Sequence, residues 1–230
     1  MNEWRMVIDH PRPGTQHMAL DARLAQEGRW AARFFTWHPG ISLGWKQPVP
    51  EWLDASAWHA AGLDLVERPT GGGIAFHGSD VSISVVVPRS VGRSVAELLG
   101  AVCRSAGRLC ESYGFEARCA CDIERGERMT YCLTEPSPYA VFLGEKKVAG
   151  FALRRYPESW LIQGSLLVNP IPGKLAEALP HDVIESLRER AMPLLQPAAT
   201  REEELMERWA DCWTVWWEEA LQAAALTHAM

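Results

Sequence analysis

The ten residues Arg-Pro-Thr-Gly-Gly-Gly-Ile-Ala-Phe-His at positions 68–77 separate two runs that are typical of β-strands, at 63–66 and 81–87. Three consecutive glycines cost conformational entropy on folding and contribute no side-chain packing. A fold tolerates them where the backbone turns sharply or lies flat against a ligand. A plain hairpin loop is one interpretation of this glycine loop. Because the loop is bounded by Arg68 and His77, a binding site is favoured over that interpretation.

A lysine and a cysteine farther along the chain add reactive side chains to this loop. Lys147 stands in the segment Lys-Lys-Val-Ala-Gly at 146–150, and Cys132 stands in Tyr-Cys-Leu-Thr-Glu-Pro-Ser at 131–137. Taken alone, Lys147 would be a solvated strand lysine and Cys132 a packed loop thiol. Cys132, however, follows a polar loop and precedes two prolines, which predicts a position at a rim. Loops carried by a rigid sheet are a usual place for catalytic residues.

These segments, taken in order, resemble the superfamily of lipoate–protein ligases, octanoyltransferases and biotin–protein ligases. The resemblance covers roughly residues 1–170 and implies the α+β catalytic-domain fold of that superfamily, a mainly antiparallel mixed sheet flanked by helices. Any one block is weak evidence, whereas several in the right order are strong evidence. The blocks are residues 4–5, 17–21, 35–37, 41–44, 68–77, 146–150 with 154–155, and 164–167.

The resemblance implies a role for each of the residues quoted above. Lys147 matches the single essential lysine of the family, and Cys132 matches the nucleophile of its cysteine-dependent octanoyltransferases. We therefore expect Cys132 and Lys147 to be catalytic. The expected substrate-binding residues are Arg68, Gly71, Gly72, Gly73, His77 and Gly150, with Ile74 and Phe76 as walls of an acyl tunnel.

Several of these side chains have more than one possible role. Lys147 could favour a thiolate or donate a hydrogen bond to the acyl carbonyl. His77 could orient the acyl thioester, act as a base for an incoming amine, or only hydrogen-bond the loop. Arg68 could brace the glycine loop or meet the phosphate of a carrier arm.

The implied reaction is protein N-octanoyl transfer in lipoate assembly. The octanoyl group would pass from acyl carrier protein, or from an octanoylated lipoyl domain, through a Cys132 thioester to a lipoyl-domain lysine. The acceptor would be glycine cleavage H protein or a dehydrogenase E2 subunit. A cysteine nucleophile divides the transfer into two thioester-level steps, and no cofactor is expected. An ATP-dependent lipoate–protein ligase, using ATP and magnesium, is the first alternative, and a non-enzymatic relative that binds acyl groups is the second.

Several positions depart from the family pattern. Gly73 stands where the most similar transferases have arginine, and this favours the ligase. Gly78 stands where an acidic residue commonly follows the loop histidine. Phe151 and Leu153 replace the serine and glutamine of a Gly-Ser-Ala-Gln block, and Gln163 replaces a histidine common in ligases. These departures leave the acyl donor open and motivate the non-enzymatic alternative.

Composition bounds the class of protein. The chain has 230 residues, a net charge of −6 and a pI near 5.7. Its length suits one domain over 1–230, with a core at 1–170 and a helical C-terminal extension at 171–230. The charge gives no basic footprint, so nucleic acid is not expected as a partner. Because there is neither an apolar run of about 18 residues nor a signal-peptide pattern, we expect a cytoplasmic protein that does not associate with membranes.

The six cysteines are expected to be free thiols in a reducing cytosol. Cys119 and Cys121 lie two residues apart, which places them on one face of a strand, but they lack the second cysteine pair of a zinc site. No metal is therefore expected. Cys103 and Cys110 are seven residues apart on a predicted helix, which indicates core packing.

Hydrophobic periodicity predicts helices interleaved with strands and hairpins, which by itself indicates an α+β domain. Residues 33–37 and 41–45 are predicted to form a hairpin through Pro39-Gly40. Ser94 is predicted to cap a helix at 95–113. In the last helix, Trp209, Trp213, Trp216 and Trp217 define one apolar face, expected to pack on the sheet, with docking to a partner as the alternative. Other helices are expected at 18–27, 52–61, 174–179, 182–190 and 202–225, other strands at 63–68, 81–85, 115–121, 139–143, 147–155 and 160–168, and a surface loop at 122–129.

Overall fold

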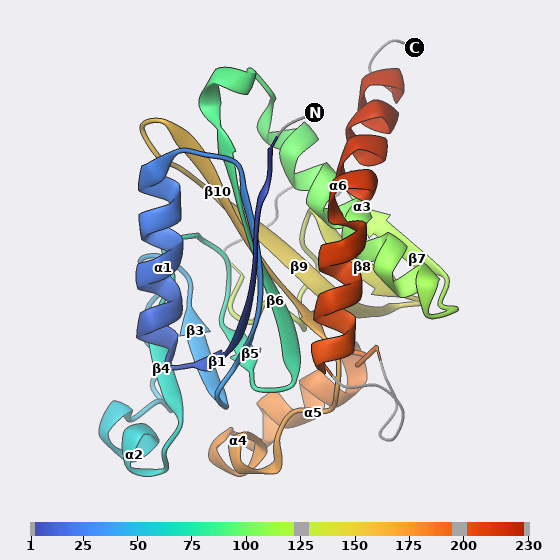
Figure 1. The fold of residues 1–230 in the computed structure, drawn as a ribbon. Coiled ribbons are helices and arrows are strands. Elements are labelled where there is room, and N and C mark those ends of the chain that lie inside the picture. The colour runs from blue at the N-terminus through green and yellow to red at the C-terminus, as the bar shows by residue number, and fades with distance from the viewer. Residues whose placement is uncertain (1–2, 122–128, 195–201, 228–230) are drawn as a thin grey trace.

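The computed structural model describes residues 3–121, 129–194 and 202–227, with side chains up to residue 223. A seven-stranded sheet forms its centre, in the order β1-β2-β6-β10-β9-β8-β7 (Figure 1). Only β1 and β2 pair in parallel in this sheet, and all other neighbours are antiparallel. The strands are β1 (Arg5–Arg12), β2 (Ala31–Trp37), β6 (Asp80–Pro88), β7 (Ala117–Ala120), β8 (Ala140–Leu143), β9 (Lys146–Arg155) and β10 (Ser159–Leu167).

A second sheet of three strands, in the order β4-β3-β5, adjoins the first. Its strands are β3 (Gly40–Leu43), β4 (Asp64–Glu67) and β5 (Ala75–His77). The glycine loop connects β4 to β5, and β6 of the large sheet follows β5 directly. The chain therefore passes from the small sheet to the large one directly after the glycine loop, between His77 and Asp80. The mainly antiparallel α+β prediction is confirmed.

Helices cover both faces of the large sheet. Alternation along β6 sends Val85 into a core with α3 (Val95–Ser112) and α6 (Glu202–Thr227), and sends Val86 into a smaller cluster with α1 (Gly14–Glu27). The remaining helices gather at the lower end of the view in Figure 1 and pack a separate core with the small sheet. They are α2 (Ala55–Ala60), α4 (Gly173–Ala178) and α5 (His181–Arg190), and a 3₁₀ turn, η1 (Arg89–Val91), follows β6.

The predicted hairpin at 33–45 is wrong. β2 belongs to the large sheet, whereas β3 belongs to the small one and pairs in parallel with β4. A Cβ on Gly40 would lie 2.2 Å from the Asp64 carbonyl oxygen, so the glycine permits close approach between β3 and β4. Alternating apolar residues look the same in a hairpin and in a crossing between sheets, and the sequence pattern could not separate the two.

Other local predictions are confirmed. Ser94 caps α3 in a capping box, in which its hydroxyl accepts from the Glu97 amide while the Glu97 carboxylate accepts from the Ser94 amide. Strands β8, β9 and β10 form the expected meander. The surface loop predicted at 122–129 lies outside the described residues except for Met129.

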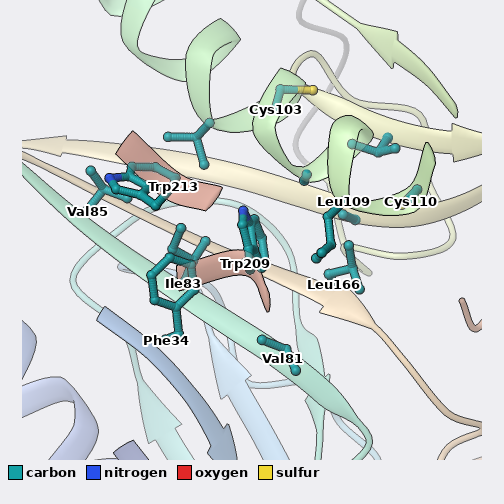
Figure 2. Close-up of a cluster of buried hydrophobic side chains, with 14 of the residues drawn as sticks. Phe34, Val81, Ile83, Val85, Cys103, Leu109, Cys110, Leu166, Trp209 and Trp213 are labelled. Atoms are coloured by element: carbon teal, nitrogen blue, oxygen red, sulfur yellow. The ribbon is translucent and has the colours of Figure 1, made fainter. Parts of the chain in front are cut away.

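The tryptophan face of α6 packs against both α3 and the sheet. Trp209, Trp213 and Trp217 are fully buried, and Trp216 packs partly buried at the edge of the same core. Figure 2 shows Trp209 and Trp213 beside Phe34 of β2, whose ring centroid lies 5.5 Å from that of Trp209. The expected packing on the sheet is therefore confirmed, with α3 as a further partner. Cys103 and Cys110 lie in this core, as their spacing predicted.

No helix within the described ranges has the length and apolar character that crossing a membrane requires. The longest, α6, has 26 residues and begins with Glu202, Glu203 and Glu204.

Replacing Trp209 by alanine should lower the free energy of unfolding by about 3–5 kcal/mol, because the change empties a large aromatic site in a packed core. It also leaves the Ser105 hydroxyl without the indole N–H that donates to it at 3.3 Å. Urea unfolding followed by circular dichroism measures the change. Val215→Ala is the control on the same helix, where Val215 is 58% exposed and the expected change is within about 0.5 kcal/mol. Equal losses in the two variants would contradict this account of the core.

Candidate active site

A cavity of about 410 Å³ lies beside the glycine loop. The glycine loop, the segment 129–139 and strands β9 and β10 bound it, and its volume lies within the range of about 300–1,000 Å³ usual for small-molecule sites. The structure thus brings together segments that are far apart in the sequence. The predicted residues on its wall are Arg68, Gly71, Gly72, His77, Cys132 and Gly150.

The prediction that Ile74 and Phe76 line the acyl tunnel is wrong. Both are buried in the core of the small sheet, because alternation along β5 directs Ala75 toward the cavity and its two neighbours away from it. Some apolar wall residues come from α1 and β2, elements that no local pattern connects to the glycine loop. They are Met18, Phe35 and Trp37.

Cys132 and Lys147 converge on Gly150. A Cβ built on Gly150 would lie 3.2 Å from the Cys132 sulfur and 3.5 Å from Lys147 Nζ. The thiol and the ammonium group therefore both lie close to one point on β9. The absence of a side chain at 150 leaves room for the thiol next to the strand.

Lys147 holds the segment that carries Cys132. Its ammonium donates to the carbonyl oxygens of Cys132 (2.5 Å) and Glu135 (3.1 Å) and to the hydroxyl of Ser137 (2.7 Å). These contacts use all three donors of the group. Lys147 is only 2% exposed, and burial lowers its pKa, while the nearby Cys132 and Glu135 oppose that change.

The Cys132 segment is also tied to the end of the glycine loop. The Ile74 amide donates to the Thr130 carbonyl at 2.7 Å, and the Cys132 amide donates to the Ile74 carbonyl at 2.8 Å. The Glu135 carboxylate accepts from the amides of Thr130 and Tyr131, which curls the segment back on itself. The backbone position of Cys132 is thus fixed from both sides.

Arg68 braces the glycine loop, which was the more conservative of its two expected roles. Nη2 donates to the carbonyl oxygens of Gly71 (3.0 Å) and Gly73 (2.6 Å), while Nη1 donates to the carbonyl (2.8 Å) and hydroxyl (3.1 Å) of Ser42. Burial lowers the pKa of Arg68, and a negative charge on Cys132 would oppose that shift. Within the described parts of the chain, neither Arg68 nor Lys147 forms an ion pair with a carboxylate.

The three glycines of the loop have different functions. Gly72 has a φ of +97°, a conformation that favours glycine. A Cβ on Gly73 would lie 2.7 Å from the Thr130 carbonyl oxygen, so Gly73 lets the Cys132 segment pack directly on the loop. A Cβ on Gly71 would meet no atom within 4 Å. In the described structure, the amide groups of all three donate to no protein acceptor.

His77 lies in a buried polar network. Its Nε2 is 2.8 Å from the hydroxyl of Ser42, and its Nδ1 is 2.9 Å from the carboxylate of Asp80. The indole of Trp37 stacks on the imidazole at a centroid distance of 3.9 Å. Sequence reasoning missed Ser42 and Asp80. Ser42 lies within the block 41–44 and Asp80 three residues after the glycine loop, yet nothing in the linear spacing shows that β3 and β6 bring them to the same histidine.

The departure at Gly78 has a structural explanation. Gly78 has a φ of +104°, and a Cβ there would lie 2.7 Å from the Cα of Pro39. The carboxylate near His77 is supplied two residues later by Asp80, which also accepts from the Gly78 amide.

The departure at Phe151 is accommodated across the sheet. Phe151 pairs with Gly164, and a Cβ on Gly164 would lie 2.0 Å from Phe151 Cδ1. The aromatic ring of Phe151 therefore packs over Gly164, the position at which β10 has no side chain. Phe151, Leu153 and Gly164 all border the cavity.

A fully buried cation, Arg33, supports the floor of the site. It donates to Asp9 at 2.8 Å and to Asp21 at 2.7 Å, and its remaining nitrogen contacts Nδ1 of His17. Because Arg33 occupies Nδ1, His17 carries its proton on Nε2, which donates to the Thr36 carbonyl at 3.0 Å. Burial and the charge of Arg33 lower the pKa of His17 to about 3.

Gln163 connects this cluster to the glycine loop. Its amide nitrogen donates to Asp21 at 2.6 Å, and its amide oxygen accepts from the Thr70 hydroxyl at 2.8 Å. The glutamine at this departure from the family pattern thus has a complete set of partners, and it forms part of the cavity wall.

No three side chains of the metal-binding residue types gather in the described part of the chain as a metal site would require. The thiol of Cys119 packs against α3 and donates to the Cys103 carbonyl at 3.4 Å.

The fold is shared with solved structures of lipoate–protein ligases. The crystal structure of lipoate-protein ligase A bound with ATP matches with a TM-score of 0.73 at 20% identity, over 96% of this chain and 93% of that one. A bi-partite lipoate protein ligase from Thermoplasma acidophilum matches with a TM-score of 0.69 at 20% identity, over 97% and 92%. At these identities the likeness establishes the fold.

The chain belongs to the family of the lipoyl protein ligase A/B catalytic domain, whose sequence profile matches residues 13–210. Octanoyltransferase LipM of Kyrpidia tusciae is 30% identical over 78% of this chain and 71% of its own length. The LipM proteins of Carboxydothermus hydrogenoformans and Geobacillus kaustophilus are each 29% identical, over 80% and 96% of this chain and 72% and 83% of their own lengths. The resemblance inferred from the sequence blocks is thereby confirmed.

Gly73→Ala should displace the Cys132 segment, because its Cβ would overlap the Thr130 carbonyl. We expect a loss of stability of about 1–3 kcal/mol, the usual cost of overpacking, and a changed rate of Cys132 alkylation. Gly71→Ala is the matched control, since its Cβ would enter open space. Denaturant unfolding and peptide-resolved iodoacetamide labelling measure the two effects. A Gly73→Ala variant indistinguishable from Gly71→Ala would disprove the packing role.

His17→Gln should weaken the dependence of the free energy of unfolding on pH below about pH 6.5. The folded state keeps His17 neutral down to a pH of about 3, whereas the unfolded chain protonates it near 6.5. Between these two pH values the unfolded state binds one more proton at His17 than the folded state does. As the pH falls, the free energy of unfolding of the wild type should therefore decrease by about 1.4 kcal/mol per pH unit, and His17→Gln should lack this contribution. Urea unfolding between pH 4 and pH 7 tests this. His181→Gln, at an exposed histidine, should keep the wild-type slope.

Proposed function

We propose that this chain is a cysteine-dependent protein N-octanoyltransferase of lipoate assembly. The convergence of the Cys132 thiol and the Lys147 ammonium on Gly150, at the wall of the cavity beside the glycine loop, carries the proposal. A ligase that activates lipoate with ATP needs no thiol at this place. The name octanoyltransferase on several relatives supports the same activity.

The electrostatics of the cavity suit acyl transfer. Arg68 and Lys147 are buried cations whose described partners are neutral oxygens, so a negative charge in the cavity would be attracted by both. The Cys132 thiolate and the oxyanion of a tetrahedral intermediate are such charges. The amides of the glycine loop, which have no acceptor among the described residues, add donors of the kind that stabilise a developing oxyanion.

The reaction would proceed in two half-reactions. Cys132 loses its proton, and the thiolate attacks the thioester carbonyl of the octanoyl donor. A new carbon–sulfur bond forms and the donor's carbon–sulfur bond breaks, so the donor leaves as a thiolate that takes up the proton lost by Cys132. The amine of a lysine then attacks the Cys132 thioester, an amide bond forms, and the Cys132 thiolate leaves. Because both the donor and the intermediate are thioesters, the transfer needs no ATP or other cofactor.

The acyl chain would lie against Met18, Phe35 and Trp37. A straight alkyl chain gains about 0.8 kcal/mol per buried methylene, so a closed apolar wall can discriminate length. Phe151 narrows the cavity from the side of β9.

The proposed partners are lipoyl-domain proteins as acceptors, such as glycine cleavage H protein or dehydrogenase E2 subunits. The proposed donor is octanoyl-acyl carrier protein, or an octanoylated lipoyl domain. Cys132 must stay reduced to act as a nucleophile, and the proposed location is therefore the reducing cytoplasm.

An ATP-dependent lipoate–protein ligase is the second candidate. The Gly71-Gly72-Gly73 sequence favours it, because similar transferases have arginine at the third position. In this chain, however, a side chain at 73 would overlap the Thr130 carbonyl, so the glycine is also explained by the position of the Cys132 segment.

The deciding experiment is the intact mass of the protein after incubation with octanoyl-acyl carrier protein in the absence of ATP. We expect a hydroxylamine-labile octanoyl adduct on the wild type and none on Cys132→Ser. Cys212→Ser, which changes another partly exposed cysteine, should form the adduct like the wild type. Adding a lipoyl domain should discharge the adduct onto its lysine.

Two other outcomes would overturn the transferase. ATP-dependent transfer of lipoate to the lipoyl domain, with no adduct, would establish the ligase. Absence of both adduct and ATP-dependent transfer would favour a non-enzymatic acyl-binding protein.

A further inference from the structure

A continuous chain of hydrogen bonds leads from the cavity to a fully buried carboxylate. Arg68 Nη1 donates to the Ser42 hydroxyl at 3.1 Å, which lies 2.8 Å from His77 Nε2, and His77 Nδ1 lies 2.9 Å from Asp80. Ser42 and His77 face the cavity, whereas Asp80 lies behind them. The chain joins β3 of the small sheet to β6 of the large one.

The hydrogen-bond partners of Asp80 determine which atoms of Asp80 and His77 carry protons. Its carboxylate accepts from the Gly78 amide and from the hydroxyls of Ser82 (3.1 Å) and Ser165 (2.6 Å). Burial alone would raise the pKa of Asp80, but the positive charge that His77 carries when protonated, the hydrogen bond from its ring and those two hydroxyls outweigh burial and lower the pKa. An ionised Asp80 only accepts, so neutral His77 carries its proton on Nδ1.

The donor and acceptor roles of the Ser42 hydroxyl follow from this tautomer of His77. Because His77 Nε2 holds a lone pair, the Ser42 hydroxyl donates its proton to that atom. The Ser42 oxygen accepts from Arg68, and one further lone pair is available to a group in the cavity. The stacking of Trp37 on the imidazole keeps the ring in this position.

The second half-reaction needs a group that accepts a proton. A lysine amine that has entered in its neutral form loses one proton as it becomes an amide. Lys147 is unsuited to this while its three donors hold the Cys132 segment. Ser42 and His77 lie on the cavity wall and are already hydrogen-bonded to each other, so together they can receive the proton.

We propose that Ser42 and His77 form the proton relay for the attacking amine. The amine N–H passes its proton to the Ser42 oxygen as Ser42 passes its own to His77 Nε2. Asp80 is a positioning residue that holds the tautomer and stabilises the imidazolium. The departing Cys132 thiolate then recovers the proton, so the protein returns to its starting state. This inference rests on the proposed transferase function.

If the relay operates, substitutions in it should slow the second half-reaction and leave the first nearly unchanged. Ser42→Ala and Asp80→Asn should form the octanoyl-Cys132 adduct at nearly the wild-type rate, because that step needs no proton acceptor for an amine. Discharge of the isolated adduct onto a lipoyl domain should slow on the order of 10²-fold or more. Rapid mixing with intact-mass detection measures each step in a single turnover. Ser105→Ala, which alters a buried serine on α3, should leave both steps unchanged.

Each remaining outcome overturns the relay. Equal slowing of both steps would mean that the network is only structural, and unchanged discharge would mean that another group takes the proton. An octanoyl ester on Ser42 in the Cys132→Ser variant would make Ser42 a nucleophile instead. If the wild type itself forms no adduct, the transferase function fails before the variants are compared, so the two failures are distinguishable.

Discussion

Arg68 and Lys147, two buried cations with no carboxylate partner among the described residues, organise the site. A buried charge is costly unless it is well compensated, and here the described partners are backbone carbonyls and hydroxyls. The glycine loop must turn its carbonyls toward Arg68, and the Cys132 segment must turn its carbonyls toward Lys147. The shapes of both segments follow from this requirement. The uncompensated positive charge remains available to a thiolate or an oxyanion in the cavity.

Arg33 illustrates the opposite case. Its partners include two carboxylates, Asp9 and Asp21, so its charge is balanced inside the protein. Balanced in this way, Arg33 supports α1, β2 and, through Gln163, the glycine loop, and it does not reach the cavity wall. A balanced cation therefore belongs to the scaffold, and the unbalanced pair belongs to the site.

The accuracy of the sequence predictions depended on how local the underlying physics was. The capping of α3 by Ser94 and the meander β8-β9-β10 depend on neighbours in the chain, and both were predicted. The hairpin through Pro39-Gly40 failed because pairing partners of β3 come from β4 and β5, which alternation does not specify. Ile74 and Phe76 were placed on the cavity wall although the pleat of β5 turns them into the other core.

By itself, the sequence determined the family, the α+β class and most of the reactive residues, because ordered blocks and special residue types such as the triple glycine are readable along the chain. It did not determine the polar network of Ser42, His77 and Asp80, or the meeting of Cys132 with Lys147 at Gly150. Those contacts join residues whose spacing in the sequence carries no information about distance. They exist only because strand pairing between the two sheets fixes their backbone positions and because buried polar groups must find partners there.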